Sequence, residues 1–378
     1  MISKLPHTGT TIFTVMSQMA QEYNAINLSQ GFPDFDVSGE LIDLVLKNMK
    51  LGNNQYAPMP GVPLLRERIS QKISDSYDVK YSPDSEITIT GGATEALYSA
   101  ITALVHPGDE VIIFEPAYDS YEPVILLNGG IPKRIKLEFP DYSIPWEQLE
   151  AALSDKTKLV IINSPHNPTG SVLSSQDMER LAEIIKQSGC YLLSDEVYEH
   201  IIFDEQVHQS ALKFSEIKHK TIAVFSFGKT FHATGWKVGY MVADQVITAE
   251  LRKVHQFLNF SVNTPIQCAL AEYLRNTENY SSVAPFYEQK RNLFLDLIKP
   301  SRFEPLLSSG TYFQLLSYKS ISDEGDFEIA ERLTKEVGIA SIPISVFYHD
   351  NLDNHILRFC FAKNDDTLKK AAKIICKI

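Results

Sequence analysis

Lys229 has neighbours in the sequence that can make its amine reactive. It follows an apolar, β-branched run at residues 221–225, which predicts a buried strand. Burial and nearby cations lower the pKa of a lysine from about 10.4 toward the range in which the neutral amine is nucleophilic. Ser226 and Lys237 add a hydroxyl and a cation nearby, which suits a phosphate dianion. Lys229 is therefore a candidate for Schiff-base chemistry, although a lysine after a strand is by itself more often a solvated loop residue.

Other polar or aromatic side chains follow predicted strands in the same way. Asp195 closes an apolar strand, and a buried carboxylate there needs a cationic partner such as a protonated pyridine nitrogen. Tyr118 could stack on a planar ring or pack in the core. The Gly-Gly-Ala-Thr turn that ends at Thr94 opens a helix whose free N–H groups suit a phosphate, and a simple N-capped turn is an equal interpretation. A metal site of Asp195, Glu196 and His200 is a weaker alternative, because no second cluster supports it.

Strands and helices alternate along the part of the chain that carries these side chains. We expect strands at residues 87–90, 111–114, 131–137, 159–162, 191–193, 221–225 and 240–242, with helices at 96–104, 146–153 and 175–187. This alternation predicts an α/β fold with a mainly parallel sheet covered on both faces. Ligands bind at the carboxyl ends of the strands in such sheets. We therefore expect one rim of the sheet to carry Thr94, Tyr118, Asn167, Asp195 and Lys229.

The pattern changes in the last part of the chain. After Pro300 we expect strands at residues 310–316 and 356–361 and helices at 327–337 and 367–378. A length of 378 residues also suits two domains. We predict a large domain over residues 36–280 and a smaller α+β domain made of residues 1–35 with 281–378.

Composition and charge narrow the classes of partner. The formal net charge is −12, from 35 Lys and Arg against 47 Asp and Glu, which argues against nucleic acid and anionic membranes. The four cysteines form no CxxC pair, and we expect free thiols and no metal. We see neither a signal-peptide pattern nor an apolar run of the roughly 18 residues that a membrane helix needs. The expected location is the cytoplasm.

The motifs in this order and spacing resemble the fold-type I pyridoxal-phosphate (PLP) enzymes of the class I/II aminotransferase family. The resemblance covers nearly the whole chain. It rests on Gly31-Phe32-Pro33, Tyr56, Gly92-Ala93-Thr94, Tyr118, Asn167-Pro168-Thr169-Gly170, Asp195-Glu196-Val197-Tyr198, Ser226-Phe227-Gly228-Lys229, Gly235-Trp236-Lys237-Val238-Gly239 and Leu357-Arg358-Phe359. Within this family the chain most resembles the kynurenine–oxoglutarate (glutamine transaminase K) and methionine aminotransferase subgroup. This resemblance is carried by the segments NLSQGFPDF, SDEVYEHI and SFGKTFHATGWKVGY. The resemblance implies a seven-stranded, mainly parallel sheet.

The family pattern assigns three catalytic roles. Lys229 would hold PLP as a Schiff base and move the substrate proton, while Asp195 would keep the pyridine nitrogen protonated. Tyr198 would donate a hydrogen bond to the ring oxygen. The remaining cofactor contacts implied by the family are Ala93, Thr94, Tyr118, Asn167, Ser226, Lys237 and Tyr56. Many relatives have arginine at the position of Lys237; lysine keeps the positive charge but lacks the bidentate fork of arginine.

The resemblance also implies substrate and subunit contacts. Arg358 would clamp the substrate α-carboxylate with its bidentate fork, with Gly31 and Asn167 completing that site. Phe13 and Phe32 are candidates for an apolar pocket around the substrate side chain. Tyr56 would reach the cofactor phosphate of a neighbouring subunit, which implies a homodimer with shared active sites.

The expected reaction moves the amino group of an apolar or aromatic L-amino acid to a 2-oxo acid. Methionine is favoured, with phenylalanine, tyrosine, leucine and kynurenine as further donors. A cysteine-S-conjugate or cystathionine β-lyase and an aspartate-type aminotransferase are the alternatives on this scaffold. A binding module without turnover is disfavoured, because the key residues Lys229, Asp195 and Arg358 are all present. A nucleotide-binding enzyme is disfavoured because GxGxxG and GxxxxGK[ST] are both missing.

Overall fold

A seven-stranded sheet forms the centre of the larger part of the molecule. The computed structural model describes residues 2–6 and 8–378. In spatial order the sheet contains β2 (Ile87–Thr90), β8 (Gly239–Ala243), β7 (Thr221–Ser226), β6 (Tyr191–Asp195), β5 (Thr157–Asn163), β3 (Glu110–Glu115) and β4 (Ile131–Lys136). Strands β7, β6, β5, β3 and β4 run parallel, and β8 is antiparallel to both of its neighbours. The prediction of an α/β fold with a mainly parallel sheet is confirmed.

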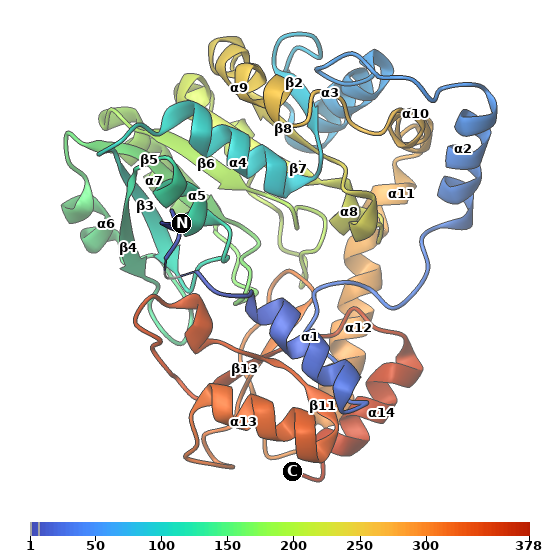
Figure 1. Cartoon of the computed structure of the whole chain (residues 1–378), viewed down its shortest axis with the longest axis vertical. Helices are drawn as coiled ribbons and strands as arrows, with labels where there is room; N and C mark the ends of the chain where they lie inside the picture. The colour runs from blue at the N-terminus through green and yellow to red at the C-terminus, as the bar shows by residue number, and fades with distance from the viewer. Residues whose placement is uncertain (1, 7) are drawn as a thin grey trace.

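Helices cover both faces of this sheet (Figure 1). Leu193 of β6 packs in the core shared with α4, and its neighbour Leu192 packs in the core shared with α7. Side chains of successive strand residues point to opposite faces, so an apolar run of this kind needs cover on both sides. The helices of this part are α2 (Gly39–Lys50), α3 (Pro63–Tyr77), α4 (Ala93–Leu104), α5 (Tyr121–Leu127), α6 (Trp146–Ala152), α7 (Ser175–Gln187), α8 (Phe227–Thr230), α9 (Gln245–Leu258), α10 (Thr264–Tyr273) and α11 (Glu278–Ser281).

A second, antiparallel sheet organises the C-terminal part. Its strands, in order, are β12 (Ile342–Pro343), β13 (Ile356–Cys360), β10 (Phe313–Ser317) and β9 (Glu304–Pro305). Around it lie α1 (Ile12–Glu22), α12 (Val283–Ile298), α13 (Asp326–Arg332) and α14 (Asp365–Ile375). Shorter turns of helix cover Ala211–Lys213, Ser215–Lys220, Thr234–Trp236, Leu333–Val337 and Ser345–Phe347.

The N-terminal segment joins this C-terminal part. Strand β1 (Ile26–Asn27) pairs in parallel with β11 (Ile339–Ala340), and Figure 1 shows the blue helix α1 among the orange and red elements. This pairing supports our proposal that residues 1–35 and 281–378 form one domain and residues 36–280 the other.

Three local expectations differ from the structure. Lys229 lies in the short helix α8 and not in a turn, because the chain coils directly after β7. For the helical stretch of residues 248–276 the sequence predicts an interruption near Pro265, whereas the helix breaks slightly earlier, at residues 259–263, where Phe260 adopts a positive φ of 65°. Helix α5 was not expected, because its seven residues are too few for a helical period to show. In the described part of the chain, every helix is too short or too polar to cross a membrane.

Candidate active site

The side chains expected at one rim line a single cavity of about 210 Å³. It lies where β5, β6 and β7 end and α4 and α8 begin. The parallel strands bring these distant segments together, as expected for an α/β sheet. The predicted residues in its wall are Ala93, Thr94, Tyr118, Asn167, Asp195, Tyr198, Ser226, Lys229 and Lys237. The wall also contains Gly92, Leu97, Asn163, Val197, Gly228, Thr234 and Val238, which sequence reasoning did not assign.

The Lys229 amine is held between two oxygen acceptors. Its Nζ donates to the Tyr312 hydroxyl at 2.8 Å and to the Gly31 carbonyl at 3.3 Å. Burial in the cavity wall lowers the pKa of Lys229 to about 8, because desolvation disfavours the charged form. A substantial fraction of the amine is therefore neutral at mildly alkaline pH, as nucleophilic or general-base chemistry requires.

Asp195 is a buried acid at the end of β6. Its carboxylate is 3% exposed and accepts from the Tyr121 hydroxyl at 2.7 Å and the Val197 N–H at 3.4 Å. Burial raises the pKa of Asp195 to about 6. No lysine or arginine lies within ion-pair distance of it in the described part of the chain. A cationic ligand group would supply the missing partner.

Tyr121 was missed by sequence reasoning because helix α5 was missed. Its ring packs edge-on against Tyr118 with centroids 5.6 Å apart. Tyr118 lies before α5, so no helical spacing connects the two tyrosines and the sequence carried no signal for Tyr121.

One end of the cavity suits a phosphate dianion. Helix α4 begins at Ala93, and its first turn has no side-chain cap, so backbone N–H groups are free for a ligand. Gly92 has φ +80°, and an added Cβ would meet Lys237 Nζ at 3.5 Å. Lys237 Nζ in turn donates to Thr94 Oγ1 at 3.4 Å. A glycine cradle, hydroxyls and an ammonium group fit the phosphate of PLP.

Arg358 is buried with spare donors and without an anion. It is 0% exposed on β13, donating to Asn167 Oδ1 at 2.7 Å and to the Ser29 carbonyl at 3.0 Å. Its Nε has no partner, and its guanidinium lies 3.9 Å from the ring centroid of Phe313. Burial lowers the pKa of Arg358 to about 10, so the group stays charged near neutral pH. Phe13 lies on the same guanidinium at 5.2 Å. A carboxylate is a ligand that would fit these donors.

Three further aromatic side chains predicted for the site differ in burial: one is buried in the cavity wall, and two are exposed and lie away from the cavity. Tyr198 is buried edge-on against Tyr312, and burial raises its pKa above the usual range. Phe32 is 44% exposed and lies under Lys363, away from the cavity wall. Tyr56 is 82% exposed and does not reach the cavity of its own chain.

A buried polar network holds the loop that follows Asp195. Glu196 accepts from Ser194 at 2.9 Å and contacts His208 at 2.8 Å. Lys72 pairs with Glu199 at 2.6 Å, and although burial opposes ionisation, this ammonium lowers the pKa of Glu199 to about 2. Both Glu196 and Glu199 are thus committed to protein partners, which disfavours the alternative of a metal site here.

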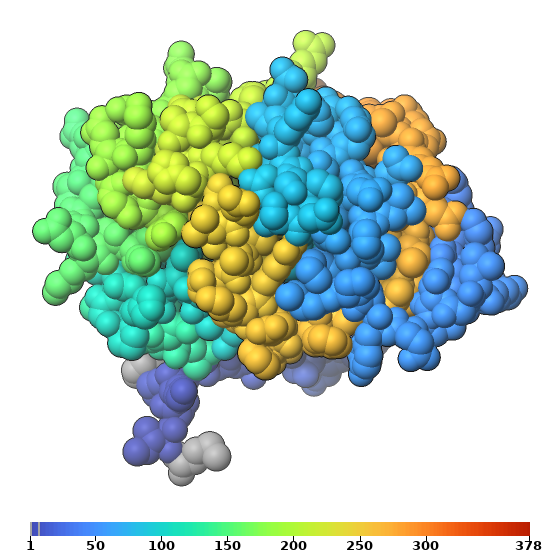
Figure 2. Space-filling model, turned by 90° about the horizontal axis from the view of Figure 1, so that it is seen from above, coloured from blue at the N-terminus to red at the C-terminus, as the bar shows by residue number. Residues whose placement is uncertain are grey.

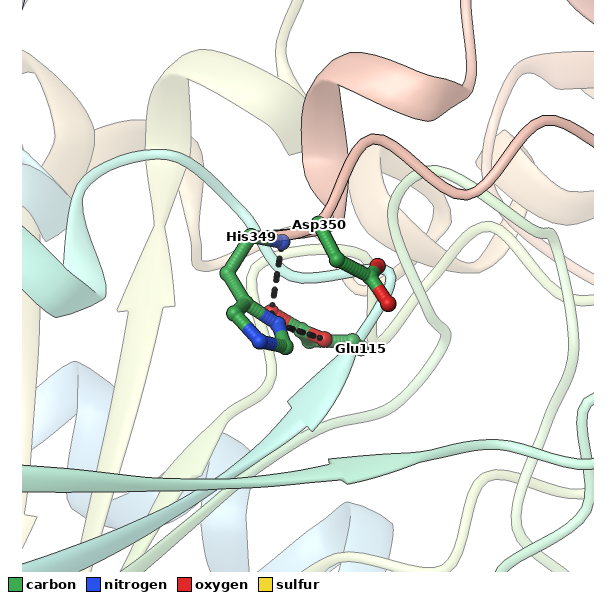
Figure 3. Close-up of side chains that lie close together, drawn as sticks. All are labelled: Glu115, His349 and Asp350. Atoms are coloured by element: carbon green, nitrogen blue, oxygen red, sulfur yellow. Dashed lines mark hydrogen bonds and ion pairs between the residues drawn. The ribbon is translucent and has the colours of Figure 1, made fainter.

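A second acidic group lies between the end of β3 and the segment after residue 347. Glu115, His349 and Asp350 bring ligand atoms within 4.8 Å of one another (Figure 3). The backbone N–H of His349 donates to Glu115 at 2.9 Å, and Lys136 forms an ion pair with Asp350. Because the Lys136 ammonium already pairs with Asp350, we interpret the group as a structural contact. It connects strand β3, which precedes Tyr118, to the C-terminal part.

Comparison with known proteins identifies the family. The chain matches Aminotransferase class I and II over residues 23–375. It is 51% identical over 372 residues to methionine aminotransferase of Escherichia coli (strain K12), covering 98% of this chain and 96% of that protein. It is 35% identical to kynurenine–oxoglutarate transaminase of Dictyostelium discoideum, covering 98% and 94%.

Solved structures agree with this result. The structure of Escherichia coli YbdL, identified as a methionine aminotransferase, has a TM-score of 0.98 at 50% identity and covers 100% of this chain and 99% of that one. N-Succinyldiaminopimelate aminotransferase of Mycobacterium tuberculosis has a TM-score of 0.96 at 34% identity, covering 100% and 99%. The fold, the cavity and these similarities lead to one conclusion: the chain belongs to the class I and II aminotransferases.

Proposed function

We propose that this aminotransferase uses PLP at Lys229 to move the amino group of methionine, and of other apolar or aromatic L-amino acids, to a 2-oxo acid. The observation that carries the proposal is the 51% identity to a methionine aminotransferase across 98% of the chain. Three buried residues support it: Lys229 lines the cavity with a lowered pKa, Asp195 has no cationic partner among the described residues, and Arg358 Nε has no hydrogen-bond partner there.

The residues of the cavity and Arg358 have separate roles in the proposed reaction. When bound, PLP supplies an electron sink for the bonds at the substrate Cα. Asp195 would keep the pyridine nitrogen protonated, and Asn167 and Tyr198 would donate hydrogen bonds to the ring oxygen, since all three line the cavity. Lys229 would take the proton from the substrate Cα, a task suited to its lowered pKa. Arg358 holds the α-carboxylate, which fixes the bond to be broken relative to Lys229.

The placement of the other arginines favours substrates without a second carboxylate. Arg66 pairs with Asp84, and Arg134 donates to Glu122 at 2.9 Å. Arg291 pairs with Asp204 at 2.6 Å. Arg252 donates to Thr88 and to the carbonyls of residues 84 and 87. None of these four lines the cavity. An aspartate side chain would therefore be buried without a counter-ion, at a cost of several kcal/mol.

We also propose a homodimer in which each site receives Tyr56 from the other subunit. Tyr56 packs on Phe260 with ring centroids 5.5 Å apart, and Phe257, three residues before Phe260 in the sequence, is 87% exposed. Figure 2 shows the blue segment near residues 50–75 and the gold segment near 250–265 side by side on this face. Exposed aromatic clusters of this kind are typical of subunit interfaces.

Complementation tests the shared sites. Co-expressed Tyr56→Ala and Lys229→Ala chains should form mixed dimers with one complete site, giving about a quarter of the wild-type sites. Activity no greater than that of the two variants purified separately would contradict the shared arrangement.

We propose the cytoplasm as the location of the enzyme. The structure has free thiols at Cys190, Cys268, Cys360 and Cys376. Thiols persist in a reducing compartment.

An absorbance titration tests the reaction. The PLP-loaded protein should show a visible cofactor band that methionine removes and a 2-oxo acid restores. Lys229→Ala should lose the lysine-dependent band. The value of kcat/KM for methionine should exceed that for aspartate. Release of thiol and ammonia from S-conjugates, without loss and recovery of the band, would instead favour the lyase.

A further inference from the structure

Tyr312 connects the reactive lysine to two distant parts of the chain. It immediately precedes β10 and is 0% exposed. Its hydroxyl accepts from Lys229 Nζ at 2.8 Å and donates to the Gly31 carbonyl at 2.5 Å. Residues from the N-terminal arm, the large sheet and the C-terminal part thus meet at one amine.

The direction of these hydrogen bonds determines where the lysine lone pair can point. A neutral amine has two N–H groups and one lone pair. The Lys229 amine has two acceptors, the Tyr312 hydroxyl and the Gly31 carbonyl, so both N–H groups are used. The Tyr312 proton is given to Gly31, and burial raises the pKa of Tyr312 well above its usual value, so that proton stays in place. Tyr312 therefore does not cap the lone pair.

We propose that Tyr312 is a positioning residue that aims the free Lys229 amine at the substrate Cα–H. The inference rests on the proposed function, in which Lys229 carries that proton. With both N–H groups held, the lone pair faces the cavity that Lys229 lines. Tyr312 acts through Lys229 and need not touch the substrate. The same positioning serves transamination and β-elimination, because both begin by removing the Cα proton.

The ring of Tyr312 has a separate packing role that the test must keep. It lies 5.2 Å from Tyr198 and 5.6 Å from Tyr287, centroid to centroid. Tyr312→Phe keeps the ring and removes only the hydroxyl. Tyr287→Phe is the matched control: it removes a buried hydroxyl from the touching ring, whose partner is His232 at 2.9 Å and not Lys229.

Kinetics of the PLP-loaded enzyme give the first readout. For Tyr312→Phe we expect kcat to fall about 10-fold to 100-fold, the factor that one hydrogen bond supplies to a charged group, because Lys229 gains positive charge as it takes the Cα proton. The KM for methionine should stay within about two-fold, since ground-state binding is unchanged. The primary isotope effect with α-deuterated methionine should rise, because proton removal becomes slower than the other steps. Tyr287→Phe should leave all three near wild type.

The pKa of Lys229 in the full-length, cofactor-free chain gives a second readout that does not depend on turnover. It is measured by competitive acetylation across a pH series, with the Lys229 peptide quantified by mass spectrometry. An oxygen acceptor favours the ammonium form, so its removal in Tyr312→Phe should lower this pKa below the wild-type value, while Tyr287→Phe should not.

The outcomes separate this inference from the proposed function. If Tyr312→Phe lowers kcat while the Lys229 pKa and the isotope effect stay at wild type, the hydroxyl is merely structural and the inference is overturned. Equal effects of Tyr312→Phe and Tyr287→Phe would overturn it too. Failure of the wild-type enzyme to transaminate methionine would overturn the proposed function, while the pKa comparison would still decide the role of Tyr312.

Discussion

Asp195→Asn should stabilise the cofactor-free protein and abolish most of its activity. Burial raises the pKa of Asp195 from its ordinary value of 3.8 to about 6. Each unit of pKa is worth about 1.4 kcal/mol, so the buried charge destabilises the folded state by about 3 kcal/mol above pH 6. Asparagine removes the charge and keeps the shape. Its oxygen can still accept from Val197, and the Tyr121 hydroxyl can turn to accept from its amide.

The effect has a definite pH dependence. Because the folded pKa lies above the unfolded one, the penalty is absent below about pH 4, grows between pH 4 and 6, and is complete above pH 6. The gain from Asp195→Asn should therefore be largest at pH 8 and fall to about half at pH 5.

Thermal unfolding of cofactor-free wild type and variant at pH 8 and pH 5 measures this gain. At pH 8 we expect the midpoint of Asp195→Asn to rise by a few degrees. Added PLP should stabilise the wild type more than the variant, since only the wild type offers a carboxylate to the pyridine nitrogen. A variant that is less stable than wild type at pH 8, or a difference independent of pH, would refute the reasoning.

Three further variants test other parts of the site. Arg358→Lys keeps the charge but loses the fork that reaches Asn167 and Ser29, so kcat/KM for methionine should fall about 100-fold in steady-state assays, mainly through KM. Gly92→Ala forces a side chain into φ +80° beside Lys237, so equilibrium titration should show roughly ten-fold weaker PLP binding. Lys72→Met leaves Glu199 charged and buried, so urea unfolding should show a loss of about 3–5 kcal/mol, with part of it regained in Lys72→Met/Glu199→Gln.

Most side chains in the cavity wall could be predicted from the positions of the strand ends in the sequence. Thr94, Asp195 and Lys229 each follow an apolar strand, and parallel strands end at one rim, so their meeting could be predicted without distances. Residues that reach the cavity from outside the sheet cannot be predicted from strand ends. Tyr312 reaches Lys229 from the C-terminal part, and nothing in the pattern GTYFQLL distinguishes a tyrosine that packs from one that binds an amine.

The proposed contact of Tyr56 with a second subunit could not be predicted from local sequence patterns, for a different reason. Tyr56 belongs to a loop with two prolines, and in one chain it is an exposed aromatic residue with no cavity beside it. Only the family resemblance connects it to a phosphate. The proposed second copy would cover this exposed tyrosine and Phe260, on which it packs.

The segment SDEVYEH shows why neighbouring polar residues need a structure to be told apart. Asp195 and Tyr198 line the cavity, whereas Glu196 and Glu199 turn away into the buried network with His208 and Lys72. A buried ion pair adds little to the free energy of folding compared with apolar packing. The network is therefore better explained by its role in holding the loop after Asp195 in place. Each glutamate fixes the backbone beside a cavity residue, which keeps the Asp195 carboxylate in place even though burial disfavours its charge. Glu196 and Glu199 thus hold the Asp195 carboxylate at the cavity, where a cationic ligand group would pair with it.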